Sequence, residues 1–582
     1  MSRKTGANSP YWDNHDALQA EIHEFSKKHP QLMQFINEQG HDPDVDRLLE
    51  GLSWHAGLLQ ARLKKDFPEL VQNFQQQLWP GYLRPVPAMT ILQASPVSAL
   101  SVLAAETEAT CRIENSAPVI FRTCRPLTLF PLYLEGCRTA ADDDHSLVIS
   151  FTVKPGTTLN NLNGLEFYLG NDAHLSRYLY FLLGNCTRSA FVTVNGVEIP
   201  LENARLHPVG MSKGEGMLPW PQNANPAHRL IQEYFCFPEG MLFLALNHDN
   251  HVLLPRHVHG NSFSLTLRFS RSAAGLRLQK DTLRINCVPA INLFRLDGEP
   301  LTISGCKTQY PLKASYMHPE VEIFAVDKIE SYERELHGEE YEYKPFTHFE
   351  HKRQSAKGQK QLCYHLRLTQ NRTTHQIRHW VSVFRSDETL WLSRPEKLSV
   401  GLWCCNGDMA AKLALGQLQQ TVSLANEVTI LKNICRPSLR LPPLMDETQF
   451  WFTLSRLARN YQSLLKPGSL SQLLINYHFP ALFNRRSEKT VQRMLEGIET
   501  METHPCIRFL AADLPVRGVK TTLTANQHAF GSEGELFLFG TVLAHFFAQC
   551  APLNTFHLFS LLNSTNQERY SWPVTIGQHS LK

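Results

Sequence analysis

The sequence predicts a multidomain α+β protein with an N-terminal helical segment, β-rich middle arms and a C-terminal α+β domain. Apolar residues recur every three or four positions before residue 88, alternate with polar residues through the middle, and return to helical spacing near the C-terminus. The chain has 582 residues, more than one hydrophobic core normally serves. We therefore expect an N-terminal helical region 1–88, a β-rich domain with an inserted helix 89–290, a second β-rich domain 291–436 and an α+β domain 437–582.

The N-terminal region carries clear helix starts and stops. Asp42 precedes Pro43, and a capping Asp before Pro at the first helical position is typical of a helix start. A second apolar stripe begins after Pro68 and ends at Trp79-Pro80-Gly81. Each stripe must be buried, either in a helical bundle of this chain or against another subunit. The side chains that we predict at a partner interface are Leu48, Leu52, Leu59, Leu70, Phe74, Trp79 and Tyr82.

The middle of the chain shows the alternation of half-buried strands. Residues 147–153 and 263–269 alternate between apolar and polar types, and Asn195-Gly196 between β-branched residues predicts a two-residue hairpin. Residues 175–182 have the spacing of one inserted helix. Further strands are predicted over residues 89–94, 320–326, 363–368, 379–384 and 398–403.

The C-terminal region begins after an extended, proline-rich linker at residues 437–443. Helical stripes cover residues 450–465 and 539–547, and Ser487 is predicted to cap a helix that reaches Ile498. We predict a strand from Phe556 to Leu562, and a tight turn at residues 530–534 that packs a helix closely against a strand. Core packing is one interpretation of these stripes; the other places three of their side chains at a partner interface, namely Trp451, Phe539 and Phe546.

A histidine cluster is the one arrangement with metal-ligand spacing. His248, His251, His257 and His259 lie close together, and Asp249 adds a carboxylate. This spacing defines an alternative function, a cytosolic metal-dependent hydrolase that uses the His248–His259 cluster. The HExxH motif is absent, so loop histidines without a metal are the simpler interpretation.

Other catalytic patterns are missing. Residues 210–216 are rich in glycine but lack the GxxxxGK[ST] spacing of a phosphate loop, and no GxSxG elbow occurs. We therefore expect no catalytic residue, metal or cofactor. A third alternative, a sugar- or peptide-binding β-domain protein, stays open at this point.

Composition and charge argue against further classes of protein. The formal net charge of +3 gives no reason to expect nucleic-acid binding. The first residues lack the apolar segment of a secretory signal, and no stretch of about 18 apolar residues occurs, so we expect a cytoplasmic protein without a membrane span. The 13 cysteines form no CxxC pair, which is typical of reduced thiols.

Short motifs occur in order across nearly the full length of the chain: His29-Pro30, Asp42-Pro-Asp-Val-Asp-Arg-Leu-Leu-Glu-Gly51, Asp66-Phe-Pro-Glu-Leu70, Leu78-Trp-Pro-Gly-Tyr-Leu-Arg-Pro-Val-Pro87, Cys287-Val-Pro-Ala-Ile-Asn-Leu-Phe294, Trp451-Phe-Thr-Leu-Ser-Arg-Leu-Ala-Arg-Asn460, Phe530-Gly-Ser-Glu-Gly-Glu-Leu-Phe-Leu-Phe-Gly540, Ala544-His-Phe-Phe547 and Trp572-Pro573. Together they resemble the motifs of the TssF family (also called ImpG or VasA) of the bacterial type VI secretion system. One departure is Cys404-Cys-Asn-Gly-Asp-Met409, where the family usually has a segment closer to NRxxP.

This resemblance implies a structural subunit of the baseplate wedge. Two copies of such a chain join one TssG-like subunit, and the wedges surround a VgrG-like spike hub. They bind TssK-like adaptors, meet the first sheath subunits, and contact the membrane complex through other baseplate subunits. The expected location is the cytoplasm, with recruitment to the cytoplasmic face of the inner membrane when the machine assembles.

Overall fold

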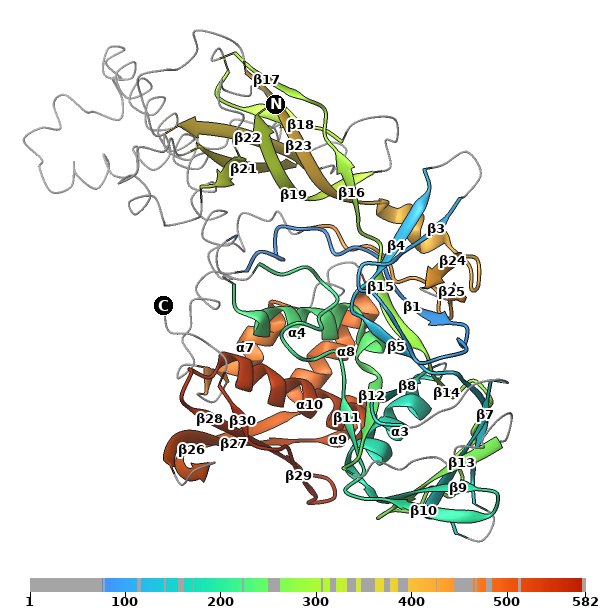
Figure 1. The fold of residues 1–582 in the computed structure, drawn as a ribbon. Coiled ribbons are helices and arrows are strands. Elements are labelled where there is room, and N and C mark those ends of the chain that lie inside the picture. The colour runs from blue at the N-terminus through green and yellow to red at the C-terminus, as the bar shows by residue number, and fades with distance from the viewer. Residues whose placement is uncertain are drawn as a thin grey trace, which may run out of the picture. The chain divides into compact units, whose positions relative to one another are not determined.

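The structure is a computed structural model, and its chain divides into two compact units. One unit comprises residues 1–75 and 446–454, and the other comprises residues 76–445 and 455–582. All described residues belong to the second unit, and Figure 1 draws them as a coloured ribbon. They are residue 76 and the ranges 79–112, 117–140, 143–154, 162–170, 172–221, 224–249, 262–304, 307–314, 321–331, 342–346, 362–370, 377–385, 396–424, 427–443, 464–465, 468–477, 484–510 and 514–577.

A six-stranded sheet joins three distant segments of the chain. Its strands, in spatial order, are β24 (Gln419–Leu424), β25 (Glu427–Asn433), β1 (Met89–Ala94), β15 (Cys287–Ile291), β4 (Val119–Thr123) and β3 (Glu108–Cys111). The strand predicted at residues 89–94 is confirmed. Because β1 pairs with both β15 and β25, residues on either side of position 291 share one sheet. The four predicted regions and their boundaries stay a prediction.

The middle of the chain forms two antiparallel sheets and two helices. The alternation predicted at 147–153 and 263–269 and the Asn195-Gly196 hairpin are confirmed; both turn residues have positive φ, 50° and 82°. The inserted helix is also confirmed, as α3 (Ala173–Asn185), and α4 (Pro226–Cys236) is a second one. The sheets contain β10 (Val197–Leu201), β9 (Thr187–Val194), β13 (Ser262–Phe269), β7 (Ser146–Val153) and β6 (Leu132–Thr139), and β11 (Arg205–Pro208), β12 (Phe243–Asn247), β8 (Leu165–Leu169) and β14 (Leu283–Arg284).

The second β-rich stretch forms an eight-stranded sheet. The four strands predicted between residues 320 and 403 are all present as β19, β21, β22 and β23. A small pair of strands, β2 (Ser101–Leu103) and β5 (Leu127–Leu129), lies outside it. The eight-stranded sheet contains β16 (Phe294–Asp297), β17 (Leu301–Ile303), β23 (Glu396–Cys405), β19 (Glu322–Ser331), β20 (Glu342–Pro345), β21 (Leu362–Gln370), β22 (Ile377–Arg385) and β18 (Tyr310–Leu312).

The C-terminal part combines a five-stranded sheet with helices (Figure 1, orange to red). Strands β27 and β28 are parallel, and a parallel connection requires a crossover, which α9 and α10 provide. The elements are α7 (Ser469–Ile475), α8 (Arg485–Glu496), β26 (Ile498–Leu510), β27 (Leu514–Ala525), α9 (Gln527–Phe530), α10 (Glu533–Cys550), β28 (Phe556–Asn563), β29 (Arg569–Ser571) and β30 (Thr575–Ile576).

Two C-terminal predictions are confirmed, and one is wrong. Helix α10 and strand β28 lie where the patterns place them. Helix α8 is capped by Asn484, not Ser487, because the Asn484 side chain accepts a hydrogen bond of 3.0 Å from the Arg486 N–H. The helix also ends before Ile498, which begins β26. The predicted N-terminal helices and the helix at 450–463 lie outside the described residues.

The predicted linker at 437–443 is extended but is bonded to the N-terminal side of the first sheet. Leu441 pairs with Val86, and the Ser438 hydroxyl accepts a 2.9 Å hydrogen bond from the Met89 N–H. The end of the middle region is therefore held next to its beginning by backbone hydrogen bonds and by the Ser438 hydroxyl.

Two buried asparagines connect the six-stranded and eight-stranded sheets. Asn292 lies between β15 and β16, and Asn406 follows β23. The Asn292 amide donates to the Asn406 side-chain oxygen (2.8 Å) and to the Ile120 carbonyl (2.7 Å), while the Asn406 backbone N–H donates to Asn292 (2.8 Å). Asn406 also donates to the Pro118 carbonyl at 3.0 Å. The segment that departs from the family motif thus supplies a structural hydrogen-bonding residue.

We predict that Asn292→Ala lowers the free energy of unfolding by about 3 kcal/mol, because it removes the side-chain partner of the Asn406 N–H and of the Ile120 carbonyl. Chemical denaturation of the purified chain measures this. The control is Asn247→Ala at the exposed end of β12, with an expected change within about 0.5 kcal/mol. Equal effects of the two substitutions would contradict the role of the asparagine pair.

Candidate functional site: the N-terminus of helix α10

Helix α10 begins with a side-chain cap. The Ser532 hydroxyl accepts a 3.1 Å hydrogen bond from the Glu535 N–H, and Gly531 before it has a φ of 83°. Ser-x-x-Glu before an apolar run is the sequence signature of such a cap. The sequence contains this signature, although the prediction for residues 530–534 includes only a turn.

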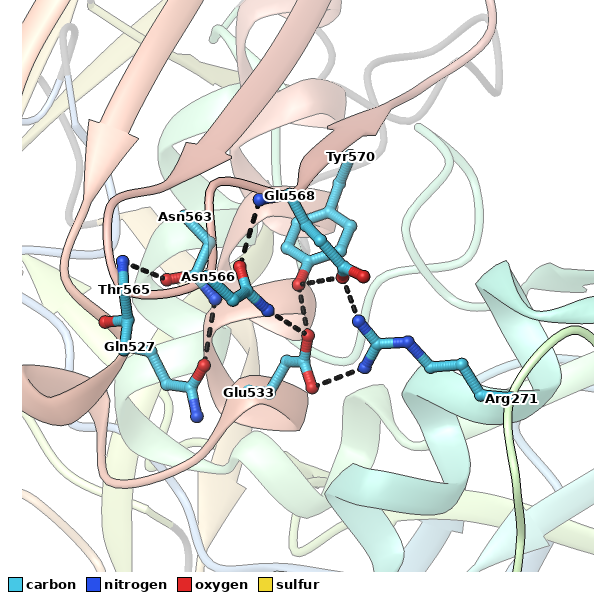
Figure 2. Close-up of polar contacts among 8 residues, drawn as sticks. All are labelled: Arg271, Gln527, Glu533, Asn563, Thr565, Asn566, Glu568 and Tyr570. Atoms are coloured by element: carbon cyan, nitrogen blue, oxygen red, sulfur yellow. Dashed lines mark hydrogen bonds and ion pairs between the residues drawn. The ribbon is translucent and has the colours of Figure 1, made fainter.

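Glu533 is the centre of a polar cluster (Figure 2). The Arg271 guanidinium donates to Glu533 at 2.8 Å and also to Glu568, and the Tyr570 hydroxyl donates to Glu533. The Asn566 amide donates to the same carboxylate at 3.2 Å. An acidic side chain in the first turn of a helix is stabilised by the helix dipole, and ionised partners strengthen its hydrogen bonds.

The turn that supplies Glu568 is itself attached to α9. The Asn563 amide donates to the Gln527 side-chain oxygen at 2.9 Å, and the Thr565 N–H donates to Asn563 at 3.1 Å (Figure 2). The Glu568 N–H donates to Asn566 at 3.0 Å. These bonds fix the turn between β28 and β29, so Asn566 and Tyr570 reach Glu533, and Glu568 reaches Arg271, from fixed positions.

Glu535 connects the same helix end to α3 and α4. It forms an ion pair with Arg177 of α3, and the Tyr234 hydroxyl of α4 donates to it at 2.9 Å. Burial raises the pKa of Glu535, while Arg177 and the Tyr234 hydrogen bond oppose that rise. The first turn of α10 therefore bonds to α3, α4, the segment after β13, and the turn before β29.

Close backbone contact is possible here because residue 534 is glycine. A Cβ atom on Gly534 would collide with the backbone carbonyl of Arg177 in α3. The predicted tight turn is confirmed, but the close approach at Gly534 is to a helix and not to a strand. The close approach to a strand occurs further along the same helix, where a Cβ atom on Gly540 would meet Leu561 of β28 and Trp572.

Aromatic side chains fill the space behind the polar cluster. Phe537 of α10 contacts Tyr180 and Phe181 of α3, with ring centroids 6.1 and 5.4 Å apart. It also contacts Tyr570 and Trp572, at 5.8 and 5.4 Å. The Phe537 side chain thus joins helix α3 to the C-terminal sheet, and its ring forms the edge-on, tilted and stacked pairs that aromatic side chains prefer.

The predicted interface residues divide into two groups. Trp79, Tyr82, Phe539 and Phe546 are buried within this chain. Trp79, for example, donates to the Gln232 side chain at 2.9 Å and lies 4.2 Å from the Tyr477 ring. Direct contact with a partner would require these side chains to leave that packing. The interface prediction itself stays a prediction, and its other members lie outside the described residues: Leu48, Leu52, Leu59, Leu70, Phe74 and Trp451.

An exposed surface that sequence reasoning missed lies on the C-terminal hairpin. Strand β27 pairs with β28 only from Gly518 onward, so residues 507–510 and 514–517 form a two-stranded extension. We call this the hairpin extension. Ile507 and Phe509 are 62% and 71% exposed. Pro505 interrupts the strand pattern in the sequence, but an edge strand such as β26 accepts proline.

Only part of the histidine cluster lies among the described residues. His248 is buried, and Asp249 accepts a 2.7 Å hydrogen bond from the Asn203 amide. His251, His257 and His259 lie outside the described residues. Within the described ranges, no group of three His, Cys, Asp or Glu side chains is arranged to hold a metal ion. Among the same residues, no helix is long and apolar enough to cross a membrane.

The glycine-rich loop at 210–216 is held by this chain's own side chains. The Gly210 N–H donates to the Glu215 carboxylate at 2.9 Å, and Arg229 of α4 donates to the Lys213 and Ser212 carbonyls at 3.0 Å. Glu233, one turn after Arg229, accepts from the Leu218 N–H at 2.7 Å. Burial raises the pKa of Glu233 to about 7, although Arg229 opposes the shift.

We predict that Gly534→Ala destabilises the chain by about 2–4 kcal/mol, because the added methyl group forces α10 away from α3. Thermal unfolding measures the effect. Gly214→Ala is the matched control, because a Cβ at Gly214 meets no atom within 4 Å. A Gly534→Ala protein as stable as the control would show that α3 and α10 can separate freely.

The Glu233 carboxyl predicts a pH-dependent stability. Its pKa is about 7 in the folded chain against an ordinary 4.5, so its contribution is complete below pH 4.5 and is lost as pH rises through 7. Glu233→Gln should remove this loss, which is on the order of 3 kcal/mol at pH 8. Melting temperatures between pH 5 and 8 test it, with exposed Glu135→Gln as control. Parallel curves for wild type and Glu233→Gln would refute the prediction.

Comparison with known proteins places the chain in a family. The family described as "Type VI secretion system, TssF" matches residues 9–579. The chain is 24% identical over 608 aligned residues to type VI secretion system component TssF1 of Pseudomonas aeruginosa, covering 95% of this chain and 96% of that protein.

Two solved structures share the fold. A chain of a TssK-TssF-TssG baseplate subcomplex of the type VI secretion system has a TM-score of 0.76 and 25% identity, covering 91% of this chain and 98% of the other. A chain of a type VI secretion baseplate complex has a TM-score of 0.59 and 21% identity, with 98% and 99% covered. This chain therefore belongs to the TssF family and is a structural baseplate protein of the type VI secretion system, not an enzyme.

Proposed function

We propose that this protein is a subunit of the baseplate wedge that assembles with a TssG-like and a TssK-like subunit. The observation that carries this proposal is the similarity, over nearly the whole of both chains, to a chain of the TssK-TssF-TssG subcomplex. In the proposed wedge, two copies of this chain join one TssG-like subunit. The wedges surround a VgrG-like spike hub and support sheath assembly and contraction.

The proposed role is mechanical. Wedge rearrangement, after the baseplate has docked on the membrane complex through its other subunits, would license sheath contraction. Such a role needs bodies that keep their shape while their interfaces change. The cluster at the start of α10 supports this, because it bonds four segments of the chain to one helix end. The proposed location is the cytoplasm, at the inner membrane once the machine assembles.

The hairpin extension is the proposed contact with a neighbouring subunit. Two large apolar side chains, Ile507 and Phe509, lie exposed on a two-stranded ribbon that its own sheet does not cover. Ile507 and Phe509 lie an even number of residues from Met501, which is buried, so all three side chains lie on one face of strand β26. The extension therefore continues the apolar face of the sheet. Exposed apolar surface that continues a core face is typical of subunit contacts.

The metal-dependent hydrolase considered from the histidine cluster is not retained. The family is one of structural baseplate proteins, and no observation on the described residues favours catalysis.

The first test is the composition of the complex. Co-expression with the TssG-like and TssK-like products of the same gene cluster, a tag on this chain, and native mass spectrometry measure it. We expect a stable complex with two copies of this chain per TssG-like subunit. A chain that stays monomeric in the presence of both products would refute the wedge proposal.

The second test concerns the hairpin extension. Phe509→Asp should lower the yield of the co-expressed complex about tenfold or more, because burial of a large apolar side chain at an interface is worth about 2 kcal/mol. The melting temperature of the chain alone should not change. Val197→Asp, in the exposed strand of another hairpin, is the matched control. Equal yields for both variants would place the contact elsewhere.

A further inference from the structure

A cavity of about 450 Å³ lies where the edges of three sheets meet. Its wall includes residues of β24, an edge strand of the six-stranded sheet, of β6, an edge strand of the five-stranded sheet, and of β14, an edge strand of the four-stranded sheet. The volume is within the range of ordinary ligand sites. Edge strands carry backbone groups that are not bonded to a neighbouring strand.

Positive charge is concentrated in this cavity. Its lining includes Lys280, Arg284 and Lys432 but only one carboxylate, Asp281, which leaves a formal charge of +2 (three cations minus one anion). In the part of the chain that the structure describes, neither Lys280 nor Lys432 forms an ion pair. Their charges therefore remain available to a ligand.

Arg284 is held in place by two neighbours. Its guanidinium donates to the Gln93 side-chain oxygen at 3.1 Å and forms an ion pair with Asp281 at 3.1 Å. The third nitrogen, Nε, is buried and has no acceptor among the described residues. A buried guanidinium N–H without an acceptor favours an incoming anion.

The sheet register aligns Lys432 with the same wall. Lys432 is paired with Gln93 across β1 and β25, and with Gln419 across β24 and β25. Residues directly opposite each other in neighbouring strands place their side chains on one face. The lysine therefore lies in a row of polar side chains that leads from the sheet edge to Arg284.

Another part of the wall is apolar. Leu134, Leu283 and Ile430 line this part, and Tyr133 also lines the cavity with 42% of its surface exposed. A free inorganic anion uses none of this apolar surface. A ligand that satisfies both parts of the wall carries a carboxylate next to an aliphatic or aromatic group.

We propose that this cavity binds an acidic segment of a partner subunit, in which an Asp or Glu is flanked by apolar residues. The inference rests on the proposed function, because the partner is a subunit of the same baseplate. Charge complementarity identifies the occupant: a peptide segment supplies the carboxylate, the apolar neighbour and backbone groups for the open strand edges. Such a contact is formed by steering and weakens as salt increases.

Photo-crosslinking tests the occupant directly. The crosslinking residue p-benzoyl-L-phenylalanine replaces Tyr133 in the full chain, which is co-expressed with the TssG-like and TssK-like products. After irradiation, mass spectrometry identifies the linked peptide. We expect one peptide of a partner subunit that contains an acidic residue beside an apolar one. A basic peptide, or the absence of any linked partner peptide from an intact complex, would overturn the proposal.

Charge reversal supplies the second measurement. Lys280→Glu with Lys432→Glu should reduce that crosslink and the stability of the complex about tenfold, and the loss should be larger at low salt. The control is Lys213→Glu with Lys397→Glu, which makes the same change in net charge at two exposed lysines outside the cavity. Equal losses for the two pairs would overturn the proposal. Failure of the unmodified chain to form any complex would instead count against the proposed function.

Discussion

The burial of helix α10 is the interaction on which the described structure depends. Fourteen of its eighteen residues are buried, because it contacts α3 and α4 as well as β28 of the C-terminal sheet. A helix that is apolar around most of its circumference is stable only when other elements surround it. The C-terminal sheet and the middle helices therefore share one core, and neither can bury its apolar face if α10 leaves.

The polar cluster at the start of α10 determines how that core is assembled. Apolar packing alone tolerates small rotations and shifts, whereas charged hydrogen bonds require particular positions. Glu533 and Glu535 receive bonds from Arg271, Arg177 and Tyr234, which come from different elements. The Asn292–Asn406 pair serves the same purpose between the two large sheets. Both sets of hydrogen bonds therefore hold the elements that they join in particular relative positions.

Much of the local structure followed from short-range patterns. The strand at 147–153, the Asn195-Gly196 hairpin and helix α10 were predicted because their signals lie within a few residues of each other. The cap of α8 was misplaced because Asn484 and Ser487 are both good capping types, and only the backbone conformation distinguishes them. The hairpin extension is not predicted, because the position of Pro505 on an edge strand, where proline is accepted, is a property of the sheet.

The candidate sites also depend partly on patterns in the sequence and partly on the tertiary structure. The α+β class, the family, and the strands and helices confirmed above could be predicted from the sequence, because periodicity and motif order are properties of the chain. Only the tertiary structure decided that Trp79 and Phe539 pack inside the chain and that Lys280, Arg284 and Lys432 line one cavity. An apolar stripe has the same spacing whether it faces a core or a partner, and cations separated by about 150 residues meet only through sheet pairing.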